Sequence, residues 1–111
     1  MKLHKRWQET RFGVFQRRTE HELFCWFELS EDEQAAYQRS DLGDRMVCEY
    51  SSRGVRLDTR LSSLVAGETR FGSEDRAYLE AIEQKIIAAA EELASELADG
   101  QAGFDDKAVD Q

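Results

Sequence analysis

Four side chains in this sequence have the nitrogen or sulfur atoms that bind transition metals: His4, His21, Cys25 and Cys48. Structural zinc sites hold their ligands in close pairs, such as two cysteines separated by two residues. None of the four residues belongs to a pair of this kind. Both cysteines lie among apolar or β-branched neighbours, so we expect two buried free thiols, with no metal and no other cofactor.

The sequence also contains no recognisable catalytic motif. It has no Gly-x-Ser-x-Gly segment, and its glycines are scattered instead of grouped into a phosphate-binding loop. His21 falls in an expected turn between two strands, where a solvated imidazole is the simplest interpretation. The acidic run 31–33 follows Ser30 in the pattern of a capping box, which explains it as the start of a helix. We therefore expect a protein that is not an enzyme.

One strand pair offers an aromatic and basic surface. Phe24 and Trp26 share the polar face of one expected strand, and Arg56 and Arg60 share the polar face of another. If the two faces coincide, aromatic rings between arginines would form a stacking platform for single-stranded nucleic acid. The net charge of −8 argues against this alternative, because nucleic-acid-binding proteins are usually basic. Cover by a helix, or pairing of the arginines with glutamates across strands, would also explain these residues.

The last expected helix carries the second candidate surface. Six apolar residues recur at spacings of three and four, which puts them on one side of the helix: Leu79, Ile82, Ile86, Ala90, Leu93 and Leu97. The simplest interpretation is that this stripe packs on the sheet, and the alternative is that Leu93 and Leu97 pair with a second copy. The outer side is acidic and predicts a partner-binding surface made of Glu80, Glu91, Glu92, Glu96 and Asp99.

Charge is unevenly distributed along the chain. Residues 1–18 hold six basic side chains and one acidic one, whereas residues 74–111 hold eleven acidic and three basic ones. The two segments therefore carry +5 and −8. Such polarity influences the choice of partner and the association rate, not the fold.

These features belong to an α+β domain with an antiparallel sheet of about four strands in ββαββα order. The long C-terminal amphipathic helix is expected to pack on one face of that sheet. The expected strands are 5–18, 22–29, 45–50 and 55–61, and the expected helices are 30–39 and 74–98. We expect one domain over residues 1–98 and a disordered acidic tail over residues 99–111.

The combination predicts a small acidic protein that acts by protein–protein contact, as an inhibitor or adaptor. We expect a protein partner with a basic surface, with a homodimer as a second option and no membrane partner. No stretch approaches the roughly 18 apolar residues of a membrane span, and no export signal is visible, so we expect a cytoplasmic protein. In size and charge alone, this profile resembles phage and mobile-element proteins that block bacterial defence complexes by DNA mimicry, including anti-CRISPR proteins.

Overall fold

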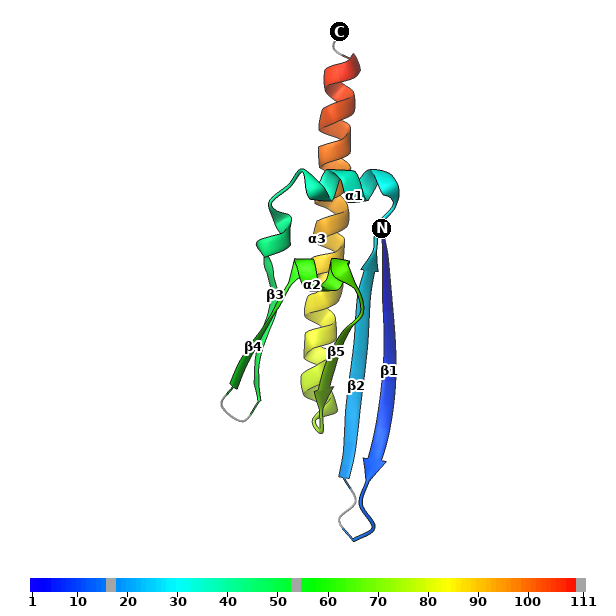
Figure 1. Ribbon diagram of the computed structural model, residues 1–111, viewed down its shortest axis with the longest axis vertical. Helices are drawn as coiled ribbons and strands as arrows, with labels where there is room; N and C mark the ends of the chain where they lie inside the picture. The colour runs from blue at the N-terminus through cyan, green and yellow to red at the C-terminus, as the bar shows by residue number, and fades with distance from the viewer. Residues whose placement is uncertain (16–17, 53–54, 110–111) are drawn as a thin grey trace.

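The structure, a computed structural model, describes residues 1–15, 18–52 and 55–109 of the chain. Side-chain surroundings are described for residues 1–15, 18–49 and 58–99. The fold is α+β, as predicted, and it is elongated, with principal extents of 72 × 25 × 19 Å (Figure 1). The long C-terminal helix packs on the sheet.

The first quarter of the chain forms a long β-hairpin. Strand β1 (Lys2–Phe12) pairs antiparallel with β2 (Arg18–Glu28), and the register places Lys2 opposite Glu28 and Phe12 opposite Arg18. Strand β5 (Thr69–Ser73) pairs with the other edge of β2 and completes a three-stranded sheet. The alternation predicted for β2 is confirmed, because Leu23, Cys25 and Phe27 all lie in the core.

A second sheet and three short helices follow the hairpin. Helix α1 (Glu31–Gln38) begins with the predicted capping box: Glu33 donates its backbone N–H to Ser30 Oγ at 3.2 Å, and Ser30 donates its own to Glu33 Oε1 at 2.9 Å. The 3-10 helix η1 covers Leu42–Asp44. Strands β3 (Met46–Ser52) and β4 (Val55–Arg60) form a two-stranded sheet, and helix α2 (Leu61–Ala66) leads towards β5.

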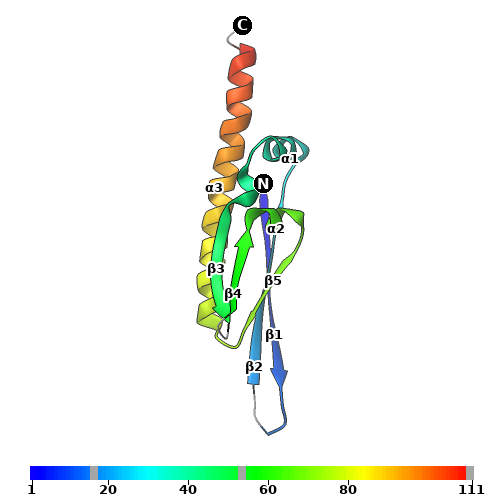
Figure 2. The same cartoon turned by 60° about the vertical axis from the view of Figure 1, so that its left-hand side comes forward.

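Helix α3 (Arg76–Val109) runs along the length of the body and holds the two sheets together (Figure 2). Its predicted apolar stripe is confirmed, because all six residues from Leu79 to Leu97 are buried. They pack against the inner face of β2 and β5, against Cys48 of β3, and against Leu61 and Leu64 of α2. Both cysteines are buried free thiols, as expected.

Four details of the structure differ from the expectations of the sequence analysis. The hairpin turn lies after Phe12 and not at residues 19–21, because Gly13 adopts a φ of 91°, which glycine tolerates far better than other residues. The expected single sheet of four strands is two sheets, and the expected loop after residue 61 contains α2 and β5. Helix α3 continues through Gly100 and Gly103 to Val109 instead of ending at 98, since each glycine inside a helix costs only about 1 kcal/mol. The expected disordered tail falls on residues whose side chains lie almost entirely outside those described.

Candidate functional site

The predicted acidic surface on α3 is partly neutralised by the chain itself. Arg45 donates two hydrogen bonds of 2.8 Å to the carboxylate of Glu96 and lies 3.8 Å from Glu92. These hydrogen bonds raise the pKa of the Arg45 guanidinium, which is therefore charged throughout the physiological range. Glu80 accepts a hydrogen bond of 3.2 Å from Arg76, one turn earlier. Glu91 and Asp99 are exposed.

The two leucines predicted to mediate self-association do not lie on the surface. Leu93 and Leu97 are 1% and 2% exposed, and their neighbours come from the same chain. The apolar stripe of α3 therefore packs in the core of its own chain, which was the simpler of the two interpretations. A second copy would have to dock through other residues.

The predicted nucleic-acid surface is assembled from different strands. Phe24 and Trp26 lie on the outer face of β2, but Arg56 and Arg60 belong to β4 in the other sheet. Arg60 donates to the backbone oxygen of Asp44 at 2.9 Å, and the side chain of Arg56 lies outside the described residues. The condition that the nucleic-acid alternative required, a common face for the two pairs, is therefore not met, because β2 and β4 belong to different sheets.

Side chains of β1 take the place that was predicted for the β4 arginines. The imidazole of His4 stacks on Trp26 with ring centroids 5.0 Å apart, and the guanidinium of Arg6 lies 4.1 Å from the centre of the Phe24 ring. One flat surface of each aromatic ring is thus in contact with a neighbour from the same sheet. A nucleic-acid base would have to displace that neighbour before it could stack on the same surface.

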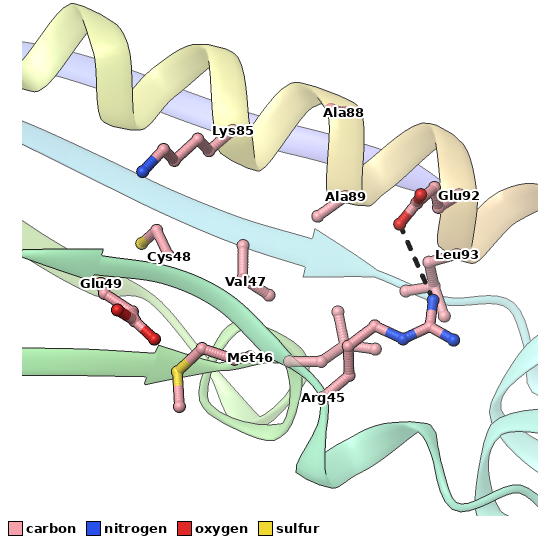
Figure 3. Close-up of a pocket in the computed structure, with 11 residues that line it drawn as sticks. Arg45, Met46, Val47, Cys48, Glu49, Lys85, Ala88, Ala89, Glu92 and Leu93 are labelled. Carbon is pink, nitrogen blue, oxygen red and sulfur yellow. Dashed lines mark ion pairs between the residues drawn. The ribbon is translucent and has the colours of Figure 1, made fainter.

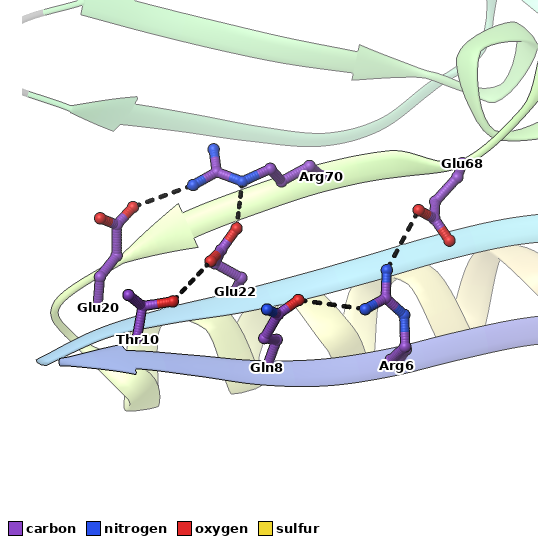
Figure 4. Close-up of polar contacts among 7 residues, drawn as sticks. All are labelled: Arg6, Gln8, Thr10, Glu20, Glu22, Glu68 and Arg70. Atoms are coloured by element: carbon purple, nitrogen blue, oxygen red, sulfur yellow. Dashed lines mark hydrogen bonds and ion pairs between the residues drawn. The ribbon is translucent and has the colours of Figure 1, made fainter.

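The charges on this outer face are also paired (Figure 4). Arg70 of β5 binds the carboxylates of Glu20 and Glu22, and this contact lowers the pKa of Glu22. Arg6 lies 3.4 Å from Glu68. Phosphate groups would have to compete with these carboxylates, so the face is poorly suited to bind a nucleic-acid strand.

The tip of the β1–β2 hairpin is a feature that the sequence analysis missed. The hairpin extends beyond the rest of the body, as the lower end of Figure 1 shows. At its tip Phe15 is 99% exposed and Val14 is 88% exposed, and Phe12 beside them is also exposed. These apolar side chains were assigned to a strand with one buried face. The available signal was the glycine between aromatic residues, which marks a turn as readily as a bulge.

Two of the described arginines, Arg11 and Arg18, lie next to this apolar tip, one on each strand of the hairpin. Residues 11–18 contain three arginines and no acidic residue. Arg11 is exposed, while Arg18 lies 2.9 Å from Glu74 and places its guanidinium 5.4 Å from the centre of the Phe12 ring. The tip, defined here as the described residues 11–15 and 18, therefore combines exposed apolar side chains with two arginines, one of which is paired with Glu74.

A groove of about 570 Å³ separates β3 from α3 on the body of the protein. Its wall on α3 includes Lys85, Ala88 and Ala89, and its wall on β3 includes Val47 and Cys48 (Figure 3). The remaining lining residues are Arg45, Met46, Glu49, Leu61, Glu92 and Leu93. Burial raises the pKa of the Cys48 thiol, which keeps it protonated and unreactive at neutral pH. The groove is thus lined by apolar and by charged side chains in about equal measure.

Within the described parts of the chain, no group of three or more histidine, cysteine or acidic side chains could hold a metal ion. None of the helices described combines the length and the apolarity that crossing a membrane requires. No family model, curated protein or solved structure matches the chain. Evidence on the function of the chain therefore comes from its own surfaces: the hairpin tip, the acidic side of α3 and the β3–α3 groove.

Proposed function

We propose that this protein acts by binding another protein through the tip of its β1–β2 hairpin, as an inhibitor or adaptor and not as an enzyme. The observation that carries the proposal is the exposure of Val14 and Phe15, at 88% and 99%. Burying a phenylalanine side chain contributes about 1.5–3 kcal/mol. Phe15 gains almost none of this in the isolated chain.

Contiguous apolar side chains on a protein surface commonly mark interaction sites. Aromatic residues and arginines are also the residue types that dominate binding energy at interfaces. The hairpin tip combines both types on an element that projects from the body, where a partner can reach it from several sides. The exposed carboxylates of Glu91 and Asp99 support a second contact with a basic partner surface, which is what DNA mimicry would require.

Affinity purification from native cells with a tip variant tests the proposal. The variant carries Val14→Ser and Phe15→Ser, and its matched control carries Ala77→Ser and Ala81→Ser, two exposed positions on α3. We expect the wild type and the control to recover the same partner in stoichiometric amount and the tip variant to lose it. Equal recovery by the tip variant would overturn the proposal.

A further inference from the structure

We propose that β1 pairs edge to edge with β1 of a second copy of this chain, antiparallel and in the register that places Trp7 opposite the partner's Trp7. The pairing joins two three-stranded sheets into one continuous sheet of six strands. The edge of β1 is distinct from the hairpin tip, so the dimer is independent of the proposed function. Three features carry the proposal: the open edge of β1, the charges along this strand, and the cleft beside Trp7.

The outer edge of β1 presents a long row of backbone hydrogen-bonding groups. The sheet order is β1-β2-β5, and within the described parts of the chain no strand pairs with the outer edge of β1 (Figure 1). Proteins commonly protect an edge strand by keeping it short, or by a bulge or a proline. Strand β1 has eleven residues in an uninterrupted register with β2, and the chain contains no proline. An antiparallel strand of the same length would form about ten backbone hydrogen bonds with this edge.

The charges along β1 favour a second copy as the strand that pairs there. Lys5 lies on the same face of β1 as Trp7, opposite the buried Cys25, and an inward-pointing charge of this kind disfavours pairing with most strands. In the proposed register Lys5 faces the partner's Glu9, and Glu9 faces the partner's Lys5. Opposite charges directly across two strands stabilise their pairing. The β1 strand is therefore complementary to itself.

Both charged side chains are available for this contact. Lys5 lies 3.8 Å from Glu83, and Glu9 lies 4.0 Å from the His21 imidazole, so neither contact is a close hydrogen bond. The side chains of Lys5 and Glu9 are 44% and 47% exposed. A partner strand can therefore engage them without breaking a tight ion pair.

Neighbouring registers lack the charge match. Residues opposite each other in an antiparallel pair share a face, so the two-fold axis must pass a residue position. An axis at position 6 would place Arg6 opposite the partner's Arg6, and an axis at position 8 would place Lys5 opposite the partner's Arg11. The axis at Trp7 opposes no two like charges and uses all eleven residues of the strand. The other cations then face uncharged residues of the partner: Lys2 faces Phe12, Arg6 faces Gln8, and Arg11 faces Leu3.

A cleft of about 370 Å³ lies between Trp7 and helix α3. The indole donates its N–H to Glu83 at 2.7 Å, and the guanidinium of Arg76 lies 4.5 Å from the centre of the ring. Trp7 nevertheless stays only half-buried. Side chains directly opposite each other in an antiparallel pair have Cβ atoms about 4.5–5.5 Å apart, so the partner's Trp7 would cover the remaining apolar surface of this ring.

Exchange of the two charges tests the register. Lys5→Glu alone would bring two glutamates opposite each other, and Glu9→Lys alone would bring two lysines opposite each other. Sedimentation across a concentration series should show each variant to dimerise about tenfold or more weakly than the wild type. An equimolar mixture of the two should regain the wild-type affinity to within about threefold, because the mixed dimer restores both opposite-charge pairs. Glu91→Lys, at an exposed position on α3, is the matched control and should leave the dimer unchanged.

Disulfide trapping reports the register directly. A disulfide requires Cα atoms within about 7 Å of each other, which only directly opposite residues provide here. A mixture of Arg6→Cys with Gln8→Cys should therefore form a covalent dimer about tenfold faster than either protein alone. A mixture of Gln8→Cys with Thr10→Cys is the matched control and should not cross-link. The native Cys25 and Cys48 are buried, so they do not compete under mild oxidation.

The possible outcomes separate this dimer from the role of the tip. A wild-type monomer at every concentration would overturn the pairing, and so would a dimer that the mixed charge variants fail to restore or that the control cysteines trap equally well. If a charge variant does not fold, the trapping result decides alone. The tip variant, Val14→Ser with Phe15→Ser, should remain dimeric. A monomeric chain whose tip variant still loses its partner in native cells would refute this inference and leave the proposed function standing.

Discussion

Substitution by alanine should affect the stability of the fold very differently at two phenylalanines of the same hairpin. Phe27 on β2 is 1% exposed and belongs to the core, whereas Phe15 at the tip is 99% exposed. If the tip is kept apolar for binding, Phe15 contributes nothing to the stability of the isolated fold. We therefore predict that Phe15→Ala leaves the free energy of unfolding unchanged and that Phe27→Ala lowers it severely.

The expected magnitudes follow from the burial of each ring. Replacing a buried phenylalanine by alanine costs about 3–5 kcal/mol, because the ring loses its transfer free energy and leaves a cavity. Substitutions of exposed side chains usually stay within about 0.5 kcal/mol. Domains of this size have total stabilities of about 5–15 kcal/mol, so Phe27→Ala is at risk of unfolding. Phe27→Leu is the milder companion, with an expected cost of about 1–2 kcal/mol.

Urea denaturation followed by circular dichroism measures these differences in dilute protein. Low concentration is essential, because self-association would add to the measured stability of both proteins. A loss of more than about 1 kcal/mol for Phe15→Ala in dilute solution would show that the ring packs within its own chain. That result would refute the assignment of the tip as a free docking element.

Three further experiments test individual side chains. The Met1 ammonium group lies 2.7 Å from Glu33 and is the main cause of the lowered pKa of the Glu33 carboxyl. The contact therefore stabilises the fold at a pH above the ordinary glutamate pKa, and this stabilisation is lost as the pH falls through the lowered pKa. Unfolding curves should therefore show Glu33→Gln to be about 1 kcal/mol less stable than the wild type at neutral pH and equally stable in strong acid. Burial raises the pKa of the Cys25 thiol to about 12. The protein should therefore lose stability as the pH rises above about 8.5, the pKa of a thiol in the unfolded chain. Unfolding curves at alkaline pH should show a smaller loss for Cys25→Ala. Trp7 donates its indole N–H to the Glu83 carboxylate at 2.7 Å. A double-mutant cycle of Trp7→Phe with Glu83→Gln should give a coupling free energy of about 1–2 kcal/mol. Additive effects of the two substitutions on stability would contradict this hydrogen bond.

The parts of the fold with strong periodicity could be predicted from the sequence. The six-residue stripe on α3 repeats over five turns, and the alternation in β2 runs without interruption, so each pattern is long enough to exclude other structures. The capping box at Ser30 was predictable for a different reason, because it depends on two side chains three residues apart.

The division into two sheets was not predictable from local patterns. Strand β5 has five residues and α2 has six, and segments of that length carry little periodicity. Which strand pairs with which depends on contacts distant in sequence, such as the pairing of Phe71 with Leu23. The same limit explains why local patterns do not reveal that Phe24 and Trp26 lie in a different sheet from Arg56 and Arg60.

The hairpin tip was not predicted because its apolar residues are exposed, whereas apolar patterns normally indicate burial. Period-based interpretation assumes that a run such as Phe12 to Phe15 is buried on at least one side. Gly13 turns the chain there instead, and the run becomes exposed. A residue kept for a partner breaks the rule that local pattern and core packing agree, and such breaks are expected at functional sites.

Position-specific photo-cross-linking in native cells tests the central claim most directly. A photoreactive amino acid at position 15 reports on the tip, and the same group at the exposed Ser62 on α2 is the control. We predict a discrete adduct with one protein, either a second copy or another chain, from position 15 and not from position 62. No adduct from position 15, or an identical pattern from both positions, would contradict the account.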